Sequence, residues 1–358
     1  MKVALLGDCH FLVRNGRKEF TLYFEKFFNT IFFPYLRSNN IDTVIQLGDL
    51  MDNRTNIPIQ GLSECKEYFF SKFDEFDINL ISIIGNHDSR YRNTIKINSP
   101  TKILREFKNI ILIDEPMVYP IKGIDCLFLP WICDENQEKS LELVKTSRAE
   151  ICFGHLELKD YLMHRGILCD QGMSAELFSG FDMVLSGHFH HKSTKGNVFY
   201  VGTPYDLTFH DDSDQKGFHI FDLENRELEF IPNPYKLFNK IYYNDIQNAD
   251  DIKSKIENNY YNKFGETYIK VIVEAKENQY LYDLFLDSLE KNFPIELSII
   301  EDFVGVMVEE FKEIDEGEDT LTILFKYINN INPKDLNNNK IKTIMSELYN
   351  EALELDAL

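Results

Sequence analysis

Long apolar segments are missing from this chain of 358 residues. No stretch approaches the ~18 consecutive apolar residues of a transmembrane helix, so we expect no membrane span. The first residues also lack the apolar core and small-residue cleavage site of a signal peptide, which argues against export. The six cysteines form no Cys-x-x-Cys pair, so a zinc ribbon and a thioredoxin-like site have no support. We therefore expect a cytoplasmic protein with reduced cysteines.

Positive charge is scarce as well. The chain has 38 Lys and Arg against 59 Asp and Glu, which gives a net charge of −21. Residues 241–358 contain 11 basic and 25 acidic residues, a balance of −14, which leaves −7 for residues 1–240. This composition argues against nucleic acid as a partner, unless a local field at one site opposes the field of the whole chain.

Short apolar runs rich in Ile, Val and Leu indicate buried strands in the first half of the chain. They are Val3–Leu6, Thr43–Leu47, Leu80–Ile84, Ile110–Ile113, Cys126–Leu129, Ile151–Phe153 and Met183–Leu185. Helical patterns over Lys18–Arg37 and Pro58–Phe73 separate the first three runs. Such alternation of strands and helices is typical of a layered α/β domain. Because Pro232 and Pro234 end this region, we expect a first domain over residues 1–235.

Residues beyond this boundary follow a different pattern. A strand at Tyr268–Glu274, a helix at Tyr280–Lys291 and a strand at Glu296–Ile300 indicate a small β-α-β unit over residues 240–300. This unit is too small to be a second enzyme. A strongly acidic stretch follows, which we interpret as a linker over residues 301–318.

The last part of the chain, residues 319–358, shows two amphipathic helical patterns. Apolar residues recur with helical spacing at Leu321, Leu324, Phe325 and Ile328, and again at Ile341, Ile344, Met345 and Leu348. Two short helices cannot form a core alone, so these apolar stripes favour docking into the groove of a partner. The alternative is that they pack back on the unit at 240–300.

Five of the expected strands end in a glycine followed by side chains that can bind metal. The segments are Gly7-Asp8-Cys9-His10, Gly48-Asp49, Gly85-Asn86-His87-Asp88, Gly154-His155 and Gly187-His188-Phe189-His190. Ligand sites of open α/β sheets lie outside the carboxyl ends of the strands, and glycine permits the sharp turn there. We therefore expect these side chains to converge. Any one of them alone is more simply a turn residue or a hydrogen-bonded polar side chain, but five in order favour a metal site.

The expected ligands are the side chains with oxygen or imidazole donors. They are Asp8, His10, Asp49, Asn86, His155, His188 and His190. Imidazole and carboxylate together suit Mn²⁺, Fe²⁺ or Zn²⁺. Seven ligands are too many for one open catalytic ion, so we expect two ions that share a carboxylate. Such a pair, ~3.5–4 Å apart, clamps the attacking and leaving oxygens of an in-line displacement at phosphorus.

These motifs, spread over residues 1–190, resemble the pattern of the calcineurin-like metallophosphoesterases. Within that family the chain resembles the nuclease subunits of SbcCD-type double-strand-break repair complexes, especially the recombination endonuclease subunits of T-even-type phages. Leu129-Pro130-Trp131 and Gly202-Thr203-Pro204 add to the resemblance. It implies a four-layer α/β/β/α sandwich, a small α+β capping domain at 240–300 that orients DNA, and C-terminal helices.

The resemblance also implies roles for the site residues. One ion is bound by Asp8, His10, Asp49 and His190, and the other by Asp49, Asn86, His155 and His188, with Asp49 bridging. Two Mn²⁺ are expected, with Mg²⁺, Fe²⁺ or Zn²⁺ as alternatives. His87 is expected to protonate the leaving oxygen, and Asp88 to orient its ring. The alternative for His87 is a purely structural hydrogen bond to Asp88.

As a function, the resemblance implies a DNA nuclease that acts in recombination, replication and double-strand-break repair. It implies 3′–5′ exonuclease action on duplex ends, endonuclease action on single strands, and an SMC-like ATPase partner bound through residues 319–358. A homodimer within a heterotetramer is expected, in the host cytoplasm if a phage encodes the chain. The alternatives are a protein phosphatase, a nucleotide phosphodiesterase or a non-catalytic scaffold subunit.

Basic residues after the metal motifs are candidates for contacts with DNA phosphates. They are Arg14, Arg17, Lys18, Arg54, Arg90, Arg92 and Lys192. The alternative is ordinary solvation of loop residues. Asp52 occupies a position where archaeal and eukaryotic relatives have a histidine, so a second histidine role in positioning DNA is in doubt, and Arg54 is a possible replacement. Residues 89–99 are a candidate homodimer contact.

The helix expected over Phe20–Leu36 carries phenylalanines on more than one face. They are Phe24, Phe27, Phe28, Phe32 and Phe33. We expect one face of this helix to pack in the core, and we favour contact of another face with a second, symmetry-related copy of the chain.

Overall fold

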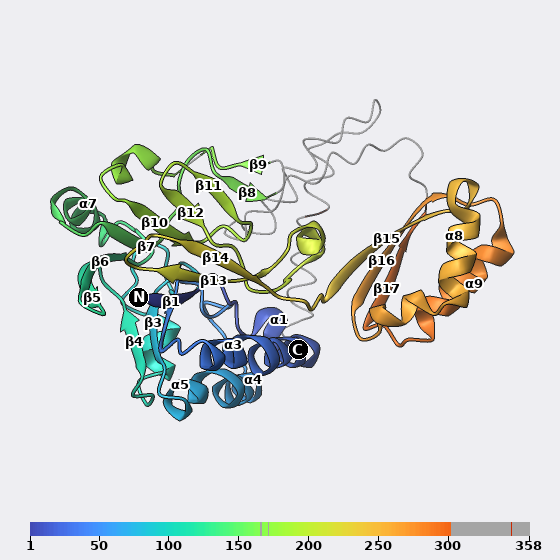
Figure 1. Cartoon of the computed structure of the whole chain (residues 1–358), viewed down its shortest axis with the longest axis horizontal. Helices are drawn as coiled ribbons and strands as arrows, with labels where there is room; N and C mark the ends of the chain where they lie inside the picture. The colour runs from blue at the N-terminus through green and yellow to red at the C-terminus, as the bar shows by residue number, and fades with distance from the viewer. Residues whose placement is uncertain (165–166, 171, 302–344, 346–358) are drawn as a thin grey trace. The chain divides into compact units, whose positions relative to one another are not determined.

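The computed structural model describes residues 1–164, 167–170, 172–301 and 345 (Figure 1). The first compact unit of the chain covers residues 1–304. The linker expected from residue 301 and the two helices expected over residues 319–358 therefore lie almost wholly outside the described residues.

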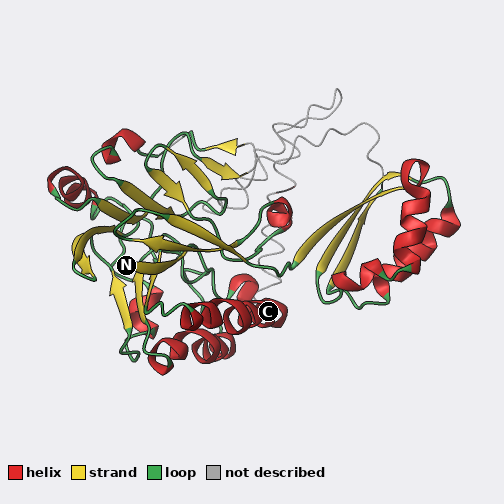
Figure 2. Ribbon diagram, viewed as in Figure 1, coloured by secondary structure: helices red, strands yellow, loops and turns green. Residues whose placement is uncertain are grey.

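Two six-stranded sheets form the centre of the first domain (Figure 2). The first sheet has the order β14 (Leu228–Pro232), β13 (Gly217–Asp222), β1 (Lys2–Leu6), β2 (Thr43–Gln46), β3 (Asn79–Ile83) and β4 (Ile110–Ile113). The second has the order β11 (Ser193–Lys195), β12 (Val198–Tyr200), β10 (Met183–Gly187), β7 (Ile151–His155), β6 (Ile124–Leu129) and β5 (Met117–Ile121). The seven strands expected from apolar runs are all present.

Side chains on β1 alternate between the two faces of the first sheet. Leu5 belongs to the core between the sheets, where it joins Phe128 and Phe153 of the second sheet. Leu6 faces the opposite way, into a core shared with the helices. A third cluster covers the outer face of the second sheet, where Val184 joins Val144 of α7 (Gln137–Thr146). The predicted four-layer α/β/β/α sandwich is therefore confirmed.

Helices cover the outer face of the first sheet (Figure 1). They are α1 (Val13–Gly16), α2 (Lys18–Phe27), the π-helical turn η1 (Phe28–Phe32), α3 (Phe33–Ser38), α4 (Ile59–Cys65), the π-helical turn η2 (Lys66–Phe70), α5 (Ser71–Glu75) and α6 (Ser99–Ile103). The phenylalanines from Phe24 to Phe33 are at most 2% exposed inside this chain. Our preference for a symmetry mate against one of their faces was wrong, because all five pack within the chain's own aromatic core, for example against Tyr205 and Phe69.

Short elements occupy the connections of the second sheet. Strands β8 (Leu162–His164) and β9 (Ile167–Leu168) form a two-stranded sheet, and η3 (Ala175–Phe178) and η4 (Phe209–Ser213) are 3-10 turns. None of them was expected from the sequence, because two- to five-residue elements carry too few apolar positions to show a period.

The later part of the first unit has its own parallel sheet. It contains β15 (Phe238–Asn244), β16 (Tyr268–Ala275) and β17 (Glu296–Ile300), together with α8 (Asp245–Glu257), η5 (Tyr260–Phe264) and α9 (Gln279–Glu290). Tyr243, Phe285 and Leu289 pack in a separate core, which the three strands share with the helices α8 and α9. The expected β-α-β pattern is present, but β15 and α8 precede it. Both were missed because their apolar residues are interrupted by Asn, Lys and Asp.

Candidate metal centre

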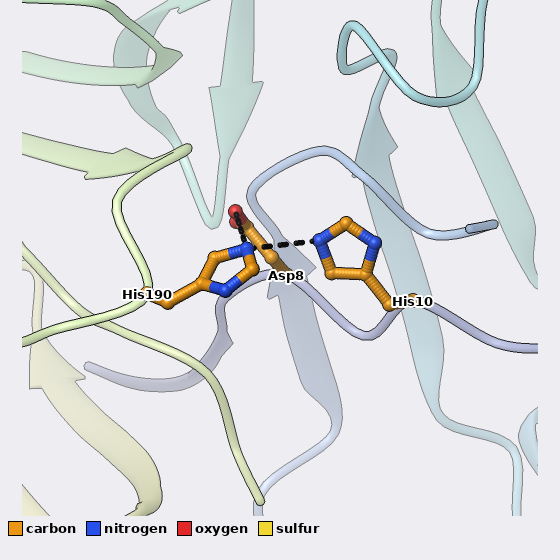
Figure 3. Close-up of side chains that lie close together, drawn as sticks. All are labelled: Asp8, His10 and His190. Carbon is orange, nitrogen blue, oxygen red and sulfur yellow. Dashed lines mark hydrogen bonds and ion pairs between the residues drawn. The ribbon is translucent and has the colours of Figure 1, made fainter. Parts of the chain in front are cut away.

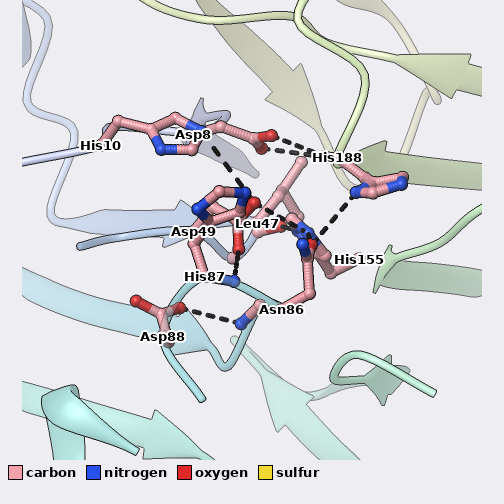
Figure 4. Close-up of polar contacts among 12 residues, drawn as sticks. Asp8, His10, Leu47, Asp49, Asn86, His87, Asp88, His155 and His188 are labelled. Atoms are coloured by element: carbon pink, nitrogen blue, oxygen red, sulfur yellow. Dashed lines mark hydrogen bonds and ion pairs between the residues drawn. The ribbon is translucent and has the colours of Figure 1, made fainter. Parts of the chain in front are cut away.

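The carboxyl ends of β1, β2 and β3 lie at one edge of the first sheet, because these strands are parallel neighbours. Strands β7 and β10 are parallel neighbours in the second sheet. The loops that follow all five strands meet, so the five glycine-containing motifs lie around one site (Figure 4).

Glycine is needed at two of these strand ends because other groups approach closely. A Cβ atom on Gly85 would collide with the Asp49 carboxylate and amide nitrogen. A Cβ atom on Gly187 would collide with the Asp8 carboxylate and the Leu47 carbonyl oxygen. Larger residues at either position would displace an expected ligand.

Three expected ligands have a backbone conformation that L-residues rarely adopt. The φ angles are 45° at His10, 51° at Asp49 and 86° at His188. Such conformations cost ~1–3 kcal/mol each and persist where surrounding contacts enforce them. Here the amides of Cys9 and His10 both donate to the Asp49 carbonyl oxygen at 3.0 Å, and the His188 amide donates to the Asp8 carboxylate at 3.0 Å. The strain therefore falls on residues that face the site.

One group of candidate ligands consists of Asp8, His10 and His190 (Figure 3). The Nε2 atoms of His10 and His190 are 3.1 Å apart, and His190 Nε2 is 3.9 Å from Asp8 Oδ2. Asp49 Oδ2 lies 4.0 Å from His10 Nε2, at the border of this group.

The second group consists of Asp49, His155 and His188, with Asn86 between the two imidazoles. His155 Nε2 is 3.3 Å from Asp49 Oδ2 and 2.9 Å from the Asn86 side-chain amide. His188 Nδ1 is 3.2 Å from the same amide. Asp49 thus reaches both groups, as a bridging carboxylate must.

The donor set fits divalent cations. Two nitrogen atoms that bind the same ion at ~2.1 Å, with a right angle between the two bonds, lie ~3 Å apart. The Nε2 atoms of His10 and His190 have this separation. Second contacts orient the rings, as is usual for metal-binding histidines. The Nδ1–H of His155 donates to the Leu47 carbonyl at 2.8 Å, which turns Nε2 toward the second group. Asp52 Oδ1 lies 3.2 Å from His10 Nδ1 and orients that ring.

Burial strongly affects the ionisation of this cluster, since Asp8 and Asp49 are each 1% exposed. Burial raises the pKa of Asp8 to about 7, and the neighbouring Asp49 adds to this effect. For Asp49, burial raises the pKa, but the neighbouring imidazoles, His155 first among them, outweigh burial and keep the pKa well below its usual range. Burial, with His155 beside it, lowers the pKa of His188 to about 3, so this imidazole is in the neutral form that binds metal.

His87 lies beside the first group without belonging to the expected ligand set. Its ring centroid is 4.9 Å from that of His10. Its amide donates to Asp49 Oδ1 at 2.8 Å, and its Nδ1–H donates to the Asp52 carbonyl oxygen at 3.0 Å. Its ring is therefore oriented by the backbone of Asp52.

The expectation that Asp88 orients the His87 ring was wrong. The buried Asp88 carboxylate accepts from the amides of Met51 and Gly85 at 2.8 Å and of Leu50 at 3.3 Å. Its acceptor positions are thus used in holding together the loops after β2 and β3. Because it accepts three hydrogen bonds from its surroundings, Asp88 is a structural residue.

A buried lysine that the sequence did not single out supports the first group. Lys216 Nζ donates to the His190 carbonyl oxygen at 2.9 Å and forms ion pairs with Asp211 at 2.6 Å and Asp214 at 3.0 Å. Only 2% of its side chain is exposed. No local signal marks this role, because a lysine at the start of a strand usually reaches solvent.

The candidate DNA contacts divide into engaged and exposed side chains. The Arg14 guanidinium lies 5.2–5.5 Å from the rings of Phe20, Phe238 and Tyr268. Lys192 Nζ donates to the Gln215 carbonyl at 2.6 Å and lies 3.3 Å from the Phe230 ring centroid, and burial lowers its pKa. Lys192 is therefore turned away from the role expected for it.

The remaining candidates differ in their exposure to solvent. Arg54 is half-buried, with Nη2 3.1 Å from the Asn86 amide, so it borders the second group. Arg17 is exposed and lies 3.7 Å from Glu19. Lys18, Arg90 and Arg92 are exposed.

The sandwich fold and the paired His/Asp groups define a metal-dependent phosphoesterase. The family model of the calcineurin-like phosphoesterases matches residues 1–192, and the chain belongs to this family. The family implies divalent metal ions at the site. Among the residues that the structure describes, no helix is long and apolar enough to span a membrane.

More specific relatives match nearly the whole chain. Exonuclease subunit 1 of Enterobacteria phage T4 is 31% identical over 99% of this chain and 100% of its own length. The SbcCD nuclease subunit of Staphylococcus epidermidis is 27% identical over 73% of this chain and 78% of its own length. The SbcCD nuclease subunit of Staphylococcus saprophyticus is 24% identical over 98% of this chain and 99% of its own length. The predicted resemblance to this branch of the family is confirmed.

Proposed function

We propose that this protein is the nuclease subunit of a DNA recombination and repair complex and that it hydrolyses phosphodiester bonds with two divalent metal ions. One observation carries the proposal: seven donor side chains from five strand ends gather in two groups that share Asp49. The end-to-end similarity to Exonuclease subunit 1 of phage T4 supports DNA as the substrate.

The two groups assign the ligands. Asp8, His10, Asp49 and His190 bind one ion, and Asp49, Asn86, His155 and His188 bind the other, with Mn²⁺ as the first choice and Mg²⁺, Fe²⁺ or Zn²⁺ as alternatives. When bound, the ions supply Lewis acidity and positive charge that attract an anionic phosphodiester despite the acidic chain. Arg54, beside Asn86, adds positive charge at the same place.

His87 moves a proton at the leaving oxygen. Its Nδ1–H is held by the Asp52 carbonyl, so Nε2 is the nitrogen that carries the transferred proton. General acid catalysis of this kind contributes ~10²–10⁴-fold to the rate. Asp52, which replaces the histidine of other relatives, thus positions both His10 and His87.

The wider assembly belongs to the same proposal. We assign 3′–5′ exonuclease action on duplex ends and endonuclease action on single strands, with residues 240–300 orienting DNA. Residues 319–358 bind an SMC-like ATPase in a cytoplasmic complex. A homodimer forms through residues 89–99, where Tyr91 and Ile97 are 52% and 51% exposed. Near full-length similarity to an SbcCD nuclease subunit supports this assembly.

The test uses the full chain, stripped with EDTA and reloaded with Mn²⁺, on labelled single-stranded and blunt duplex DNA. We expect cleavage that EDTA abolishes and Mn²⁺ restores. His155→Asn should abolish it, whereas the matched control His210→Asn, at an exposed histidine, should not. A phosphopeptide is assayed as a second substrate, and hydrolysis of the phosphopeptide but not of DNA would make the protein a phosphatase. If His155→Asn kept full activity on the substrate that the parent hydrolyses, the metal assignment would be refuted.

A further inference from the structure

A cavity of about 170 Å³ opens beside the second group of candidate ligands. Its lining includes His155 of that group, together with Trp131, Cys133, Glu157 and Met173. Trp131, the single tryptophan of the chain, has its ring centroid 5.1 Å from that of His188 and 6.0 Å from that of His155. The indole of Trp131 and the candidate ligand His155 therefore border the same space, and His188 lies against the indole.

One wall of this cavity is held rigidly by hydrogen bonds. The Trp131 amide donates to the Ile84 carbonyl at 2.8 Å, and the Asn136 side-chain amide donates to the Trp131 carbonyl at 3.0 Å. The Cys133 amide donates to Asn136 Oδ1 at 2.9 Å. The turn after β6 thus presents the indole in a defined position before any ligand arrives, which reduces the ordering cost of binding.

Gly172 and Met173 also line the cavity. The Met173 amide donates to the Glu157 carbonyl at 3.0 Å, and the Lys159 amide donates to the Met173 carbonyl at 3.0 Å. Gly172 has a φ of 93°, and a Cβ atom there would lie 2.6 Å from the Glu157 carbonyl oxygen. Only glycine lets this segment lie so close to residue 157.

The chemistry of the lining indicates the occupant. Trp131, Ile132 and Met173 provide apolar and aromatic surface, while Asp134 and Glu157 provide carboxylates. The carboxylates disfavour a phosphate inside the cavity, so the phosphate remains at the metal ligands and an uncharged planar group enters. The volume suits one nucleobase and is far too small for a base pair.

We propose that this cavity binds one unpaired nucleobase of the strand being cleaved, stacked on Trp131 and adjacent to the scissile phosphate. The inference rests on the proposed nuclease function and makes it more specific: the substrate is a single strand or a frayed end. Stacking of a base on an aromatic side chain contributes ~1–3 kcal/mol and tolerates every base, since each has a π-face. Trp131 is then a specificity-determining residue.

Because Trp131 is the single tryptophan, its fluorescence reports occupancy directly. Full-length protein with Mg²⁺ is titrated with deoxyadenosine monophosphate and, separately, with 2-deoxyribose 5-phosphate. We expect the nucleotide to quench the fluorescence at a concentration about tenfold lower than the sugar phosphate. Equal quenching by both would overturn the proposal, because the base would then add nothing.

Cleavage of oligonucleotides gives the second test. A single abasic residue is moved along a single strand, and the cleavage rate of each bond is measured with Mn²⁺. We expect one position relative to the cleaved bond at which the abasic residue slows cleavage about tenfold. In Trp131→Ala this sensitivity should disappear, and in Trp131→Phe it should persist. Leu22→Ala, which removes an exposed apolar side chain that does not line the cavity, should behave like the parent.

The outcomes separate this inference from the proposed function. If intact oligonucleotides are cleaved but no position is sensitive to base removal, the base pocket is refuted and the nuclease function stands. If no oligonucleotide is cleaved at all, the nuclease function itself fails, and the pocket proposal fails with it.

Discussion

The Nε2 atoms of His10 and His190 lie 3.1 Å apart, although 180 residues separate them in the chain. His10 follows β1 of one sheet and His190 follows β10 of the other, so their contact joins the two sheets of the sandwich. Two imidazoles at this distance suit a shared cation, since both can turn a lone pair toward it. This pair is the basis of the first prediction.

His190→Asn should lower the number of Mn²⁺ ions bound per chain from two to one. The second group, which contains Asp49, His155 and His188, lacks His190 and should keep its ion. Isothermal titration calorimetry on EDTA-stripped protein measures the stoichiometry, and His210→Asn is the matched control. Two ions bound by His190→Asn would remove this residue from the ligand set.

His87→Ala should lower kcat for DNA cleavage by about 10²–10⁴-fold with little change in bound Mn²⁺, because we propose that the ring transfers a proton and does not bind metal. Single-turnover cleavage and metal analysis on the same sample measure both quantities. Asp88→Asn is the informative comparison, since Asp88 only accepts backbone hydrogen bonds. It should lower the free energy of unfolding and leave the pH dependence of kcat unaltered. Full activity of His87→Ala would contradict the assignment.

Lys216→Met should reduce the free energy of unfolding by about 3–5 kcal/mol. Removal of the ammonium leaves Asp211 as a buried carboxylate without its cation, while Asp214 keeps only His191, and breaking a buried pair has a cost of this size. Urea denaturation measures the change. Lys195→Met, at an exposed lysine, should change stability by less than about 0.5 kcal/mol. If the two variants were equally stable, Lys216 would have no structural role.

Arg92→Gln should weaken DNA binding and flatten its salt dependence, since an exposed arginine that contacts one phosphate releases about one counterion. The slope of log K against log[salt] should fall by ~0.7–0.9. Lys192→Gln is the contrast, because that ammonium is engaged with Gln215 and Phe230. Its slope should match that of the parent chain. If the slope fell for Lys192→Gln and stayed unchanged for Arg92→Gln, then Lys192 and not Arg92 would contact the phosphate.

Asp206→Asn should make the stability less dependent on pH. Burial, with Asp211 nearby, raises the pKa of Asp206 from 3.8 to about 7. A group whose pKa is raised on folding stabilises the fold at low pH, and this contribution is lost as pH rises from about 4 through about 7. Between pH 5 and pH 8 the parent chain should therefore lose more than about 1 kcal/mol relative to Asp206→Asn.

Denaturation curves of the parent chain and the variant at the two pH values give this difference. The same comparison of the parent chain with Asp250→Asn, at a fully exposed position, should show none. A parent chain that gains stability relative to Asp206→Asn as pH rises would mean that the sign of the shift is wrong.

Local patterns were sufficient for the strands that carry the site. Runs such as Val3–Leu6 and Met183–Leu185 are buried on both faces, so they are apolar throughout and are visible without any neighbour. β15 and α8 were not visible, because polar residues interrupt the apolar pattern of both, and buried positions of β15 include Asn239 and Asn244. The Phe24–Phe33 segment was misjudged for a related reason: the sequence does not reveal that Tyr205 and Phe69 cover its second face.

By itself, the sequence determined which side chains stand at the strand ends that form the candidate metal centre, since a glycine and a polar side chain after a buried strand form a local signal. The tertiary structure alone decided how those groups are supported. The Asp52 carbonyl, and not the adjacent Asp88, holds the His87 ring. Lys216 holds the His190 backbone, and Trp131 and Met173 line the same cavity. Those partners come from loops tens of residues apart, and which of them meet depends on how two sheets pack, which no short stretch of residues encodes.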